Sequence, residues 1–330
     1  MLLGSSGVFG SAIAAALRDR GVDPLTPSHA QVDVEKSETL LAGLQPRDVV
    51  VDAAGPFHLR STALVEVAIK IGADVIDLSD NLDYALAIYA FDDRIERAGI
   101  SVLTSCSAVS AVTAAVVRKS DIEDPVRVSV CLLPASRETS SPSTAWSLLR
   151  SLAHPMRVLR DGRLTAAAGW SSSRSFRLLN RRGAVRGYLA ESADAVTLPR
   201  VWPSLRTVEF MVDTQVTGLN RMISAGLLLP FGGTLIERLA PAGLGFARLL
   251  GSRSGGYVVE VEAANDRVAT TALMARRRSY ITAAMPATLA AISLARGGSL
   301  PAGVVPPDRH CDPDELFAEL RKTGIQIDQY

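Results

Sequence analysis

Three evenly spaced glycines near the start of the chain constrain its fold more than any other feature. Gly4, Gly7 and Gly10 form a G-x-x-G-x-x-G loop between the apolar stretch Leu2–Leu3 and an apolar-periodic run over residues 11–20. In a doubly wound sheet, the order strand, glycine turn, helix presents backbone N–H groups to the pyrophosphate of a dinucleotide. Gly4 permits the tight turn, Gly7 lets the backbone approach phosphate, and Gly10 lets the helix pack closely on the strand. The loop therefore predicts a nicotinamide or flavin nucleotide site formed by Gly4, Ser5, Ser6, Gly7, Val8, Phe9 and Gly10.

The bulk properties narrow the class of protein. A chain of 330 residues with 48% hydrophobic and 21% charged residues is long enough for two globular domains. The net charge of +1 removes the case for a general basic field, so no nucleic-acid partner is expected. Three distant cysteines fit neither a disulfide framework nor a metal site, which favours a cytoplasmic setting. No secretory signal is visible, and the first strand is so short that either the chain is clipped or its start lies upstream.

Alternating strand and helix patterns organise the first part of the chain. Continuous apolar runs predict buried parallel strands, and the runs between them predict helices that end at glycines. The expected strands are residues 49–54, 75–78 and 100–103, and the expected helices are residues 11–20, 61–71 and 82–98. Residues 22–28 form a poor strand because Pro24 and Pro27 interrupt them. This order predicts a Rossmann-type, doubly wound parallel sheet over residues 1–122.

The pattern changes after about residue 120. Residues 126–132 alternate with a period of two, which is typical of a half-buried strand, and residues 134–144 are typical of a loop. Further strands are expected at residues 207–212, 257–263 and 268–275, and helices at 282–295 and 313–322. We therefore expect a second α/β domain with a mixed or antiparallel sheet over residues 123–280, for substrate binding and dimerisation.

Three segments follow strand ends, where open α/β sheets bind their ligands. The first is the glycine loop. The second is Asp52–Phe57, whose small residues Ala54, Gly55 and Pro56 let the backbone lie against a ribose or nicotinamide. The third is Asp77–Asp80. Their joint presence in this order strengthens the prediction of a dinucleotide site.

Together these segments resemble the saccharopine dehydrogenase-like NAD(P)-binding oxidoreductases in their short bacterial form. The resemblance is carried by GSSGVFG (4–10), VVVDAAGPF (49–57), ADVIDLSD (73–80), AGISVLTSCSAVSAVTAAVV (98–117), RDGRLTAAAGW (160–170), YVVEVEA (257–263) and GVVPPDRHCDPDELFAELRKTGIQI (303–327). It implies a nucleotide-binding domain, an inserted α/β domain, a C-terminal segment 281–330 that packs back on the first domain, and a homodimer. It also implies hydride transfer to or from a small substrate, an imine or an activated double bond.

The chain departs from the family pattern in two places. Ser105, Ser110 and Ala111 stand where such proteins commonly carry Gly and Pro, so no specific substrate is carried over. The segment Thr26-Pro27-Ser28-His29 offers neither an acid for a ribose 2′-OH nor an arginine for a 2′-phosphate. Ser28 and His29 suit either cofactor. NAD and NADP both stay open, and the family resemblance favours NADP slightly.

The catalytic residues are unknown from the sequence, and three weak candidates stand out. Asp77 and Asp80 are placed to orient a substrate amine or exchange protons, or else to cap a helix and bind loop amides. Cys106 follows a strand, where a small buried cysteine is the commoner case. His58 is placed near the nicotinamide or on a surface loop. A short-chain dehydrogenase Tyr-Lys pair, a P-loop and a His/Cys metal cluster are all missing from the sequence.

Two further features permit more than one interpretation. An arginine run suits either a carboxylate or acyl-phosphopantetheine substrate, or a solvated or dimer-contact face: Arg174, Arg177, Arg181, Arg182 and Arg186. The same holds for residues 276–278. The apolar region 222–251 is too interrupted to span a membrane and indicates either buried or interface helices or a membrane-surface element.

These alternatives leave two rival functions beside the oxidoreductase with a small substrate. One is a reductase of lipid or carrier-bound acyl substrates at a membrane surface. The other is a non-catalytic NAD(P)-binding sensor or scaffold.

Overall fold

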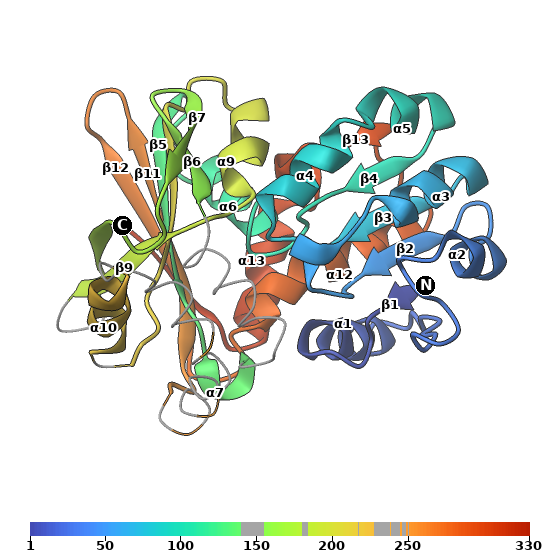
Figure 1. Cartoon of the computed structure of the whole chain (residues 1–330), viewed down its shortest axis with the longest axis horizontal. Helices are drawn as coiled ribbons and strands as arrows, with labels where there is room; N and C mark the ends of the chain where they lie inside the picture. The colour runs from blue at the N-terminus through green and yellow to red at the C-terminus, as the bar shows by residue number, and fades with distance from the viewer. Residues whose placement is uncertain are drawn as a thin grey trace. The chain divides into compact units, whose positions relative to one another are not determined.

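The computed structural model comprises two compact units, which share the chain unevenly (Figure 1). It describes residues 1–139, 155–179, 184–216, 218–227, 238, 245, 249 and 251–330. The first unit contains Met1–Ala115 and Ile281–Glu319, and the second contains Val116–Tyr280 and Leu320–Tyr330.

The first unit is built on a parallel sheet of five strands in the order β1-β2-β3-β4-β13. The strands are β1 (Leu2–Leu3), β2 (Val49–Asp52), β3 (Asp74–Asp77), β4 (Ser101–Leu103) and β13 (Gly303–Val304). Their valine, isoleucine and leucine side chains are almost all buried, as expected for strands covered on both faces. This sheet confirms the Rossmann-type prediction.

Helices cover both faces of this sheet. The helices and helical turns that begin in this unit are α1 (Val8–Arg18), α2 (Ser37–Gly43), η1 (Phe57–Leu59), α3 (Ala63–Ile71), α4 (Leu82–Tyr89), α5 (Asp92–Ala98), α6 (Ala111–Arg118), α12 (Ile281–Ala295), η3 (Pro307–Arg309) and α13 (Pro313–Lys322); α6 and α13 end in the second unit. Helix α12 packs on α1 and against β2 and β3, and Figure 1 shows α3 and α5 on the opposite face. Because the strands are parallel, the loops that follow their carboxyl ends lie along one edge of the sheet, which we call the rim.

Elements α2, α6 and β13 were not predicted, and two predicted elements differ from expectation. The segment 22–28 forms no strand: Leu25 O accepts a hydrogen bond from Leu2 N, but Pro24 and Pro27 have no N–H to continue a ladder. The single helix expected over 82–98 is two helices, α4 and α5. The second starts at Asp92, whose carboxylate accepts a hydrogen bond from Val304 N on β13.

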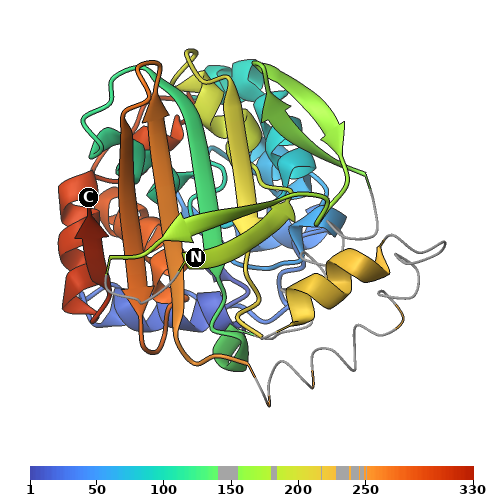
Figure 2. The ribbon, with the colours of Figure 1, turned by 90° about the vertical axis from the view of Figure 1, so that its left-hand side faces the viewer.

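The second unit is a mixed sheet of nine strands in the order β14-β12-β11-β5-β10-β6-β7, with the β8–β9 hairpin attached through β9 and β10 (Figure 2). Strands β5 and β10 are parallel and the other pairs antiparallel, which confirms the second α/β domain with a mixed sheet. The strands are β5 (Pro125–Leu133), β6 (Met156–Arg160), β7 (Arg163–Ala167), β8 (Ser173–Arg177), β9 (Ala184–Ala190), β10 (Thr207–Val212), β11 (Gly255–Ala263), β12 (Val268–Ala275) and β14 (Gln326–Gln329).

Several parts of the second unit were not predicted. Strands β6 to β9 were not predicted from the sequence. The turn Asp161-Gly162 between β6 and β7 is nevertheless a strong hairpin signal, and its two residues have φ values of +50° and +75°. Short helices α7 (Ser136–Thr139), α9 (Asp194–Thr197), η2 (Leu198–Arg200) and α10 (Leu219–Gly226) complete the described elements. Strand β14 pairs with β12, so residues 320–330 belong to this unit rather than to the first domain, where we expected them.

Candidate nucleotide-binding site

The glycine loop is the turn between β1 and α1, and its first glycine touches the next strand's loop. Gly4 has a φ of +72°, a conformation that favours glycine. A Cβ at this position would lie 2.6 Å from the Ala53 carbonyl group. A Cβ on Gly10 would lie 2.2 Å from Gly4 O, so the helix also begins in contact with the turn. Both glycines are required by close backbone packing: Gly4 at the tight turn, as expected, and Gly10 against the turn itself rather than against the strand.

Gly7 is different, because open space lies beside it. It is the N-cap of α1, its N–H donates to Gly4 O at 3.0 Å, and an added Cβ would meet only Gly4 O at 3.4 Å. The helix start has no side-chain cap and no acidic residue in its first turn. The first N–H groups of a helix have no intrahelical partners, and the helix dipole makes this end positive. The start of α1, with the exposed residues Ser6 and Gly7 in front of it, is therefore suited to bind an anion.

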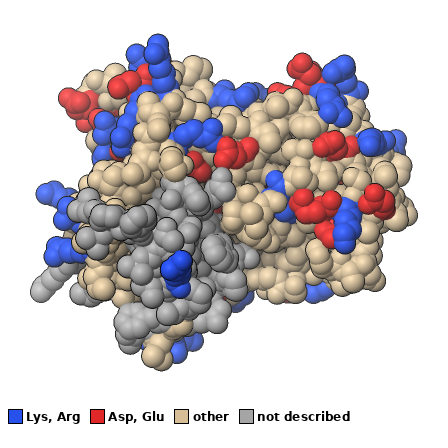
Figure 3. Space-filling model, viewed as in Figure 1, with Lys and Arg blue, Asp and Glu red and all other residues tan. Residues whose placement is uncertain are grey.

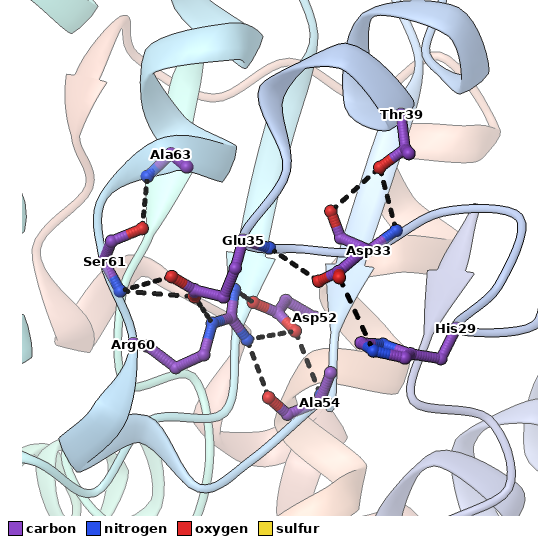
Figure 4. A network of polar contacts seen from close by, with 9 residues as sticks. All are labelled: His29, Asp33, Glu35, Thr39, Asp52, Ala54, Arg60, Ser61 and Ala63. Carbon is purple, nitrogen blue, oxygen red and sulfur yellow. Dashed lines mark hydrogen bonds and ion pairs between the residues drawn. The ribbon is translucent and has the colours of Figure 1, made fainter.

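The small-residue loop Ala53–Pro56 after β2 is held by a buried ion pair (Figure 4). Asp52 is fully buried, and its Oδ2 lies 2.9 Å from Arg60 Nη2. Arg60 Nη1 donates to Ala54 O at 2.7 Å, and Asp52 Oδ1 accepts from Ala54 N at 3.0 Å. Gly55 and Pro56 follow, joined by a cis peptide bond. The pair fixes the loop backbone that packs against Gly4.

Arg60 is charged and almost enclosed. Its side chain is only 4% exposed, and its Nε donates to Glu35 Oε1 at 2.7 Å. Burial alone would lower its pKa, but the neighbouring Asp52 carboxylate outweighs burial and raises it. The guanidinium also lies over the Phe57 ring, with 5.5 Å from its central carbon to the ring centroid. Arg60 therefore links β2, the small-residue loop and the segment around Glu35.

The segment 28–36 carries the residues that sequence analysis assigned to the ribose. Ser28 is exposed, and both its N–H and its hydroxyl donate to the Gln31 side chain. His29 Nε2 lies 3.5 Å from Asp33 Oδ2, and Lys36 Nζ lies 3.2 Å from the same oxygen (Figure 4 shows the His29 contact). Asp33 is thus shared between the imidazole of His29 and the ammonium group of Lys36.

Asp77, at the end of β3, organises the loop that follows β4. Its Oδ1 accepts from the N–H groups of Ser79 and Ser105, both at 2.9 Å, and its carbonyl accepts from Cys106 N at 2.7 Å. Its Oδ2 is buried without a hydrogen-bond partner among the described residues. Burial raises the pKa of Asp77 to about 6, against the opposite effect of the two N–H donors. The observed contacts match the loop-binding role that the sequence left open.

The serine loop Thr104–Ser110 explains one departure from the family pattern. Ser105 and Ser110 have φ values of +58° and +66°, the left-handed region in which glycine is commonly found. Both are fully buried. Each non-glycine residue in this conformation lowers the stability of the fold by about 1–2 kcal/mol. The hydrogen bond that Ser105 N donates to Asp77 Oδ1 helps to offset this cost.

The other candidate residues near this rim differ in exposure. Asp80 is exposed, and His58 lies half-buried on η1. Cys106 is fully buried, and burial raises the pKa of its thiol well above its ordinary value, so it is protonated at neutral pH. The buried environment favours the structural interpretation of Cys106 over a nucleophile.

Tyr84 and Arg60 are buried polar residues beside this loop that the sequence analysis missed. The Tyr84 hydroxyl is buried with no hydrogen-bond partner in the described part of the chain, and its ring packs edge-on against Phe57 at 5.4 Å between centroids. Burial, then Asp77 and Asp52, raise the pKa of its phenol. No spacing pattern marks these residues. The only signal was Asp52 itself, because a carboxylate ending a buried strand requires a partner.

The arginine run and the apolar region are only partly described. Arg181, Arg182 and most of residues 228–250 lie outside the described residues. Arg174 pairs with Glu260 at 2.7 Å, and Arg186 donates to Ser173 Oγ. On the face drawn in Figure 3, basic and acidic side chains are interspersed.

Among the residues that the structure describes, no three His, Cys, Asp or Glu side chains are grouped to hold a metal ion. In the described part of the chain, each helix is too short or too polar to cross a bilayer.

Comparisons with solved structures identify the fold. Apo saccharopine dehydrogenase (L-Glu forming) from Saccharomyces cerevisiae is similar with a TM-score of 0.58 and 13% identity, over 100% of this chain and 98% of that chain. The chain has the fold of saccharopine dehydrogenase. The fold implied by the sequence resemblance is therefore confirmed.

Two other solved structures are similar at lower scores. They are a mutant meso-DAPDH from Clostridium tetani (TM-score 0.44, 14% identity, 97% of this chain and 94% of that chain) and an oxidoreductase from Agrobacterium radiobacter in complex with NAD+, L-tartaric acid and magnesium (TM-score 0.36, 12% identity, 100% of this chain and 96% of that chain). No protein-family model and no curated protein matches the sequence.

Proposed function

We propose that the protein is an NAD(P)-dependent oxidoreductase that transfers hydride to or from a small substrate, an imine or an activated double bond. The observation that carries this proposal is the uncapped start of α1 beside Gly7, walled by the small-residue loop that touches Gly4. The saccharopine dehydrogenase fold supports it. In this proposal the protein binds and orients the nucleotide, and the nucleotide supplies the chemistry.

The residues present fit a dinucleotide. The N–H groups of Val8, Phe9 and Gly10 begin α1 and face no capping side chain, and the open space at Gly7 lets phosphate oxygens approach them. Ser5 and Ser6 would add hydroxyl donors to the phosphates. The small-residue loop, with Ala54, Gly55 and Pro56, would lie against the nicotinamide ring. When bound, the nicotinamide supplies the hydride chemistry. Asp77 holds the serine loop at the next strand end, and no side chain is assigned as acid or base.

We further propose that NADP is the preferred cofactor. In doubly wound folds an acid near this position holds the ribose 2′-OH of NAD. Here both nearby acids are engaged: Asp33 contacts His29 and Lys36, and Glu35 contacts Arg60. His29 and Lys36 have side chains 80% and 66% exposed, and Ser28 is exposed beside them. A 2′-phosphate would meet the Lys36 ammonium group, the His29 imidazole and the Ser28 hydroxyl there.

Calorimetric titration with NADP and NAD tests both proposals. We expect tighter binding of NADP, and His29→Asp should lower NADP affinity at least tenfold (about 1.4 kcal/mol) while leaving NAD affinity equal or higher. Leu41→Asp is the matched control, because it adds the same charge at an exposed site on α2. Binding of neither nucleotide would overturn the oxidoreductase proposal. Equal loss of both nucleotides in His29→Asp would overturn only the preference.

The partner assignments remain proposals. The homodimer and the small-molecule substrate rest on the family resemblance, and the cytoplasmic setting rests on the cysteine usage.

A further inference from the structure

A separate pocket of about 560 Å³ lies within the second unit. Ligand sites commonly have volumes of this order. It is formed where three chain segments meet: in the sheet register, Val212 at the end of β10 lies between Leu132 of β5 and Tyr188 of β9. The start of α10 completes it. The described lining residues are Leu133, Val185, Arg186, Tyr188, Asp213, Gln215, Val216, Gly218, Asn220 and Arg221.

The wall after β10 is rigidly held. Asp213 Oδ1 accepts from Gln215 N at 2.9 Å and from Asn220 Nδ2 at 2.8 Å. Gln215 has a φ of +57°, and its side-chain amide donates to Pro134 O at 3.0 Å and Ser254 O at 2.8 Å. Left-handed backbone at a residue other than glycine costs about 1–3 kcal/mol and persists only where the surroundings hold it. The wall is thus set before any ligand arrives.

The polar part of the lining favours an anion. Among the described lining residues, two are arginines, Arg186 and Arg221, and one is an acid, Asp213, whose Oδ1 already accepts two N–H donors. Gly218 caps α10 without a side-chain hydrogen bond, and the first turn of the helix contains no acid. The dipole of α10 adds positive potential at the same place. Arg186 is anchored by its Nε donating to Ser173 Oγ at 2.9 Å.

The rest of the lining is apolar and flat. The Tyr188 ring stacks on Trp170, with centroids 6.1 Å apart and planes 17° apart. Trp170 is 1% exposed, so the Tyr188 ring has a rigid support behind it. Leu133, Val185 and Val216 extend this surface. An aromatic or aliphatic body would bury apolar area here.

We propose that this pocket is a binding site for a small amphipathic anion, whose carboxylate, sulfonate or phosphate contacts Arg186 and Arg221 and whose apolar body packs on Tyr188. Every described lining residue belongs to the second unit, whereas the residues of the proposed nucleotide site belong to the first. Charge-assisted hydrogen bonds to two arginines would supply specificity for the anion, and Tyr188 would select a planar or apolar body.

The test uses a matched pair of fluorescent probes on the full chain with saturating NADP present, so that the nucleotide site is covered. The anionic probe is 8-anilinonaphthalene-1-sulfonate, and the neutral probe is N-phenyl-1-naphthylamine, which lacks the sulfonate. We expect Arg186→Gln/Arg221→Gln to raise the Kd of the anionic probe at least tenfold and to leave the neutral probe unchanged. Arg163→Gln/Arg206→Gln removes two other exposed arginines of the same unit and should change neither.

The outcomes separate this proposal from the nucleotide proposal. The anion-site proposal is overturned if the Kd of the anionic probe is the same in wild type and in Arg186→Gln/Arg221→Gln. It is also overturned if the wild-type Kd for this probe lies above about 1 mM. An equal loss of affinity for both probes in Arg186→Gln/Arg221→Gln would show that the pocket binds apolar ligands and would overturn the proposed recognition of an anion. Arg221→Glu is the second variant: Arg221 is exposed on α10, so we expect its replacement to keep the fold and to raise the Kd of the anionic probe as well. Repeating the titration without NADP reports the nucleotide site separately.

Discussion

Replacing Gly7 by alanine should separate nucleotide binding from folding. Gly7 has φ −75° and ψ 169°, which alanine adopts freely, and the new Cβ would meet only Gly4 O at 3.4 Å. Loss of glycine's freedom in the unfolded chain stabilises by about 0.4–1 kcal/mol. Alanine is a poorer N-cap than glycine by up to about 1 kcal/mol. These effects offset each other, so the free energy of unfolding should stay within about 1 kcal/mol of wild type.

Nucleotide affinity should fall sharply in the same variant. The added methyl group occupies the open space in front of the α1 start, where phosphate oxygens must come within hydrogen-bond distance of the N–H groups. We expect the Kd for NADP to rise at least tenfold, which corresponds to about 1.4 kcal/mol. Urea unfolding measures the first quantity and calorimetric titration the second.

The neighbouring glycines are the controls. Gly4→Ala combines a left-handed φ, worth about 1–2 kcal/mol, with overlap at 2.6 Å, so it should destabilise by at least about 2 kcal/mol. Gly10→Ala overlaps at 2.2 Å and should behave similarly. Wild-type NADP affinity in Gly7→Ala would refute the reasoning. So would a Gly7→Ala loss of stability as large as that of Gly4→Ala.

Two further predictions concern the buried charges. Arg60→Met should destabilise by about 3–5 kcal/mol in urea unfolding because it leaves the Asp52 carboxylate buried without its partner, and Asp52→Asn in the same chain should recover most of this loss. A double variant as unstable as Arg60→Met would contradict that account. Asp77 has a folded pKa of about 6 against 3.8 as its ordinary value, so the folded state binds the extra proton between these values. The free energy of unfolding should therefore fall as pH rises from about 4 to 6, by on the order of 3 kcal/mol from this group. Asp77→Asn should remove that part of the pH dependence, and unchanged curves would exclude it.

Local patterns were enough to predict the parallel sheet of the first unit and most of its helices. Gly4 and Gly10 are demanded by contacts within ten residues or with the adjacent strand, and the apolar runs of β2 to β4 mark parallel strands covered on both faces. Because connections between parallel strands are short and right-handed, the order of strands and helices is compatible with only a few sheet topologies. The same patterns located the rim where the glycine loop and the small-residue loop meet.

Long-range pairing could not be predicted in the same way. Strand β13 has two residues and pairs with Ser101 and Val102, far away in the chain. Strand β14 joins β12 although its sequence shows no strong alternation. The hairpin β6–β7 could have been found from Asp161-Gly162, but the polar faces of β7 and β8 weaken the period-two signal.

The sequence by itself determined the glycine turn, the alternation that makes a parallel sheet, and the class of ligand such a turn suits, because each depends on neighbours a few residues apart. Only the tertiary structure decided that Asp52 pairs with Arg60, that Asp77 holds the serine loop, and that a charged pocket forms beside Tyr188. These depend on burial and on contacts between distant segments. Burial sets the energy of a charge, and a spacing pattern does not record it.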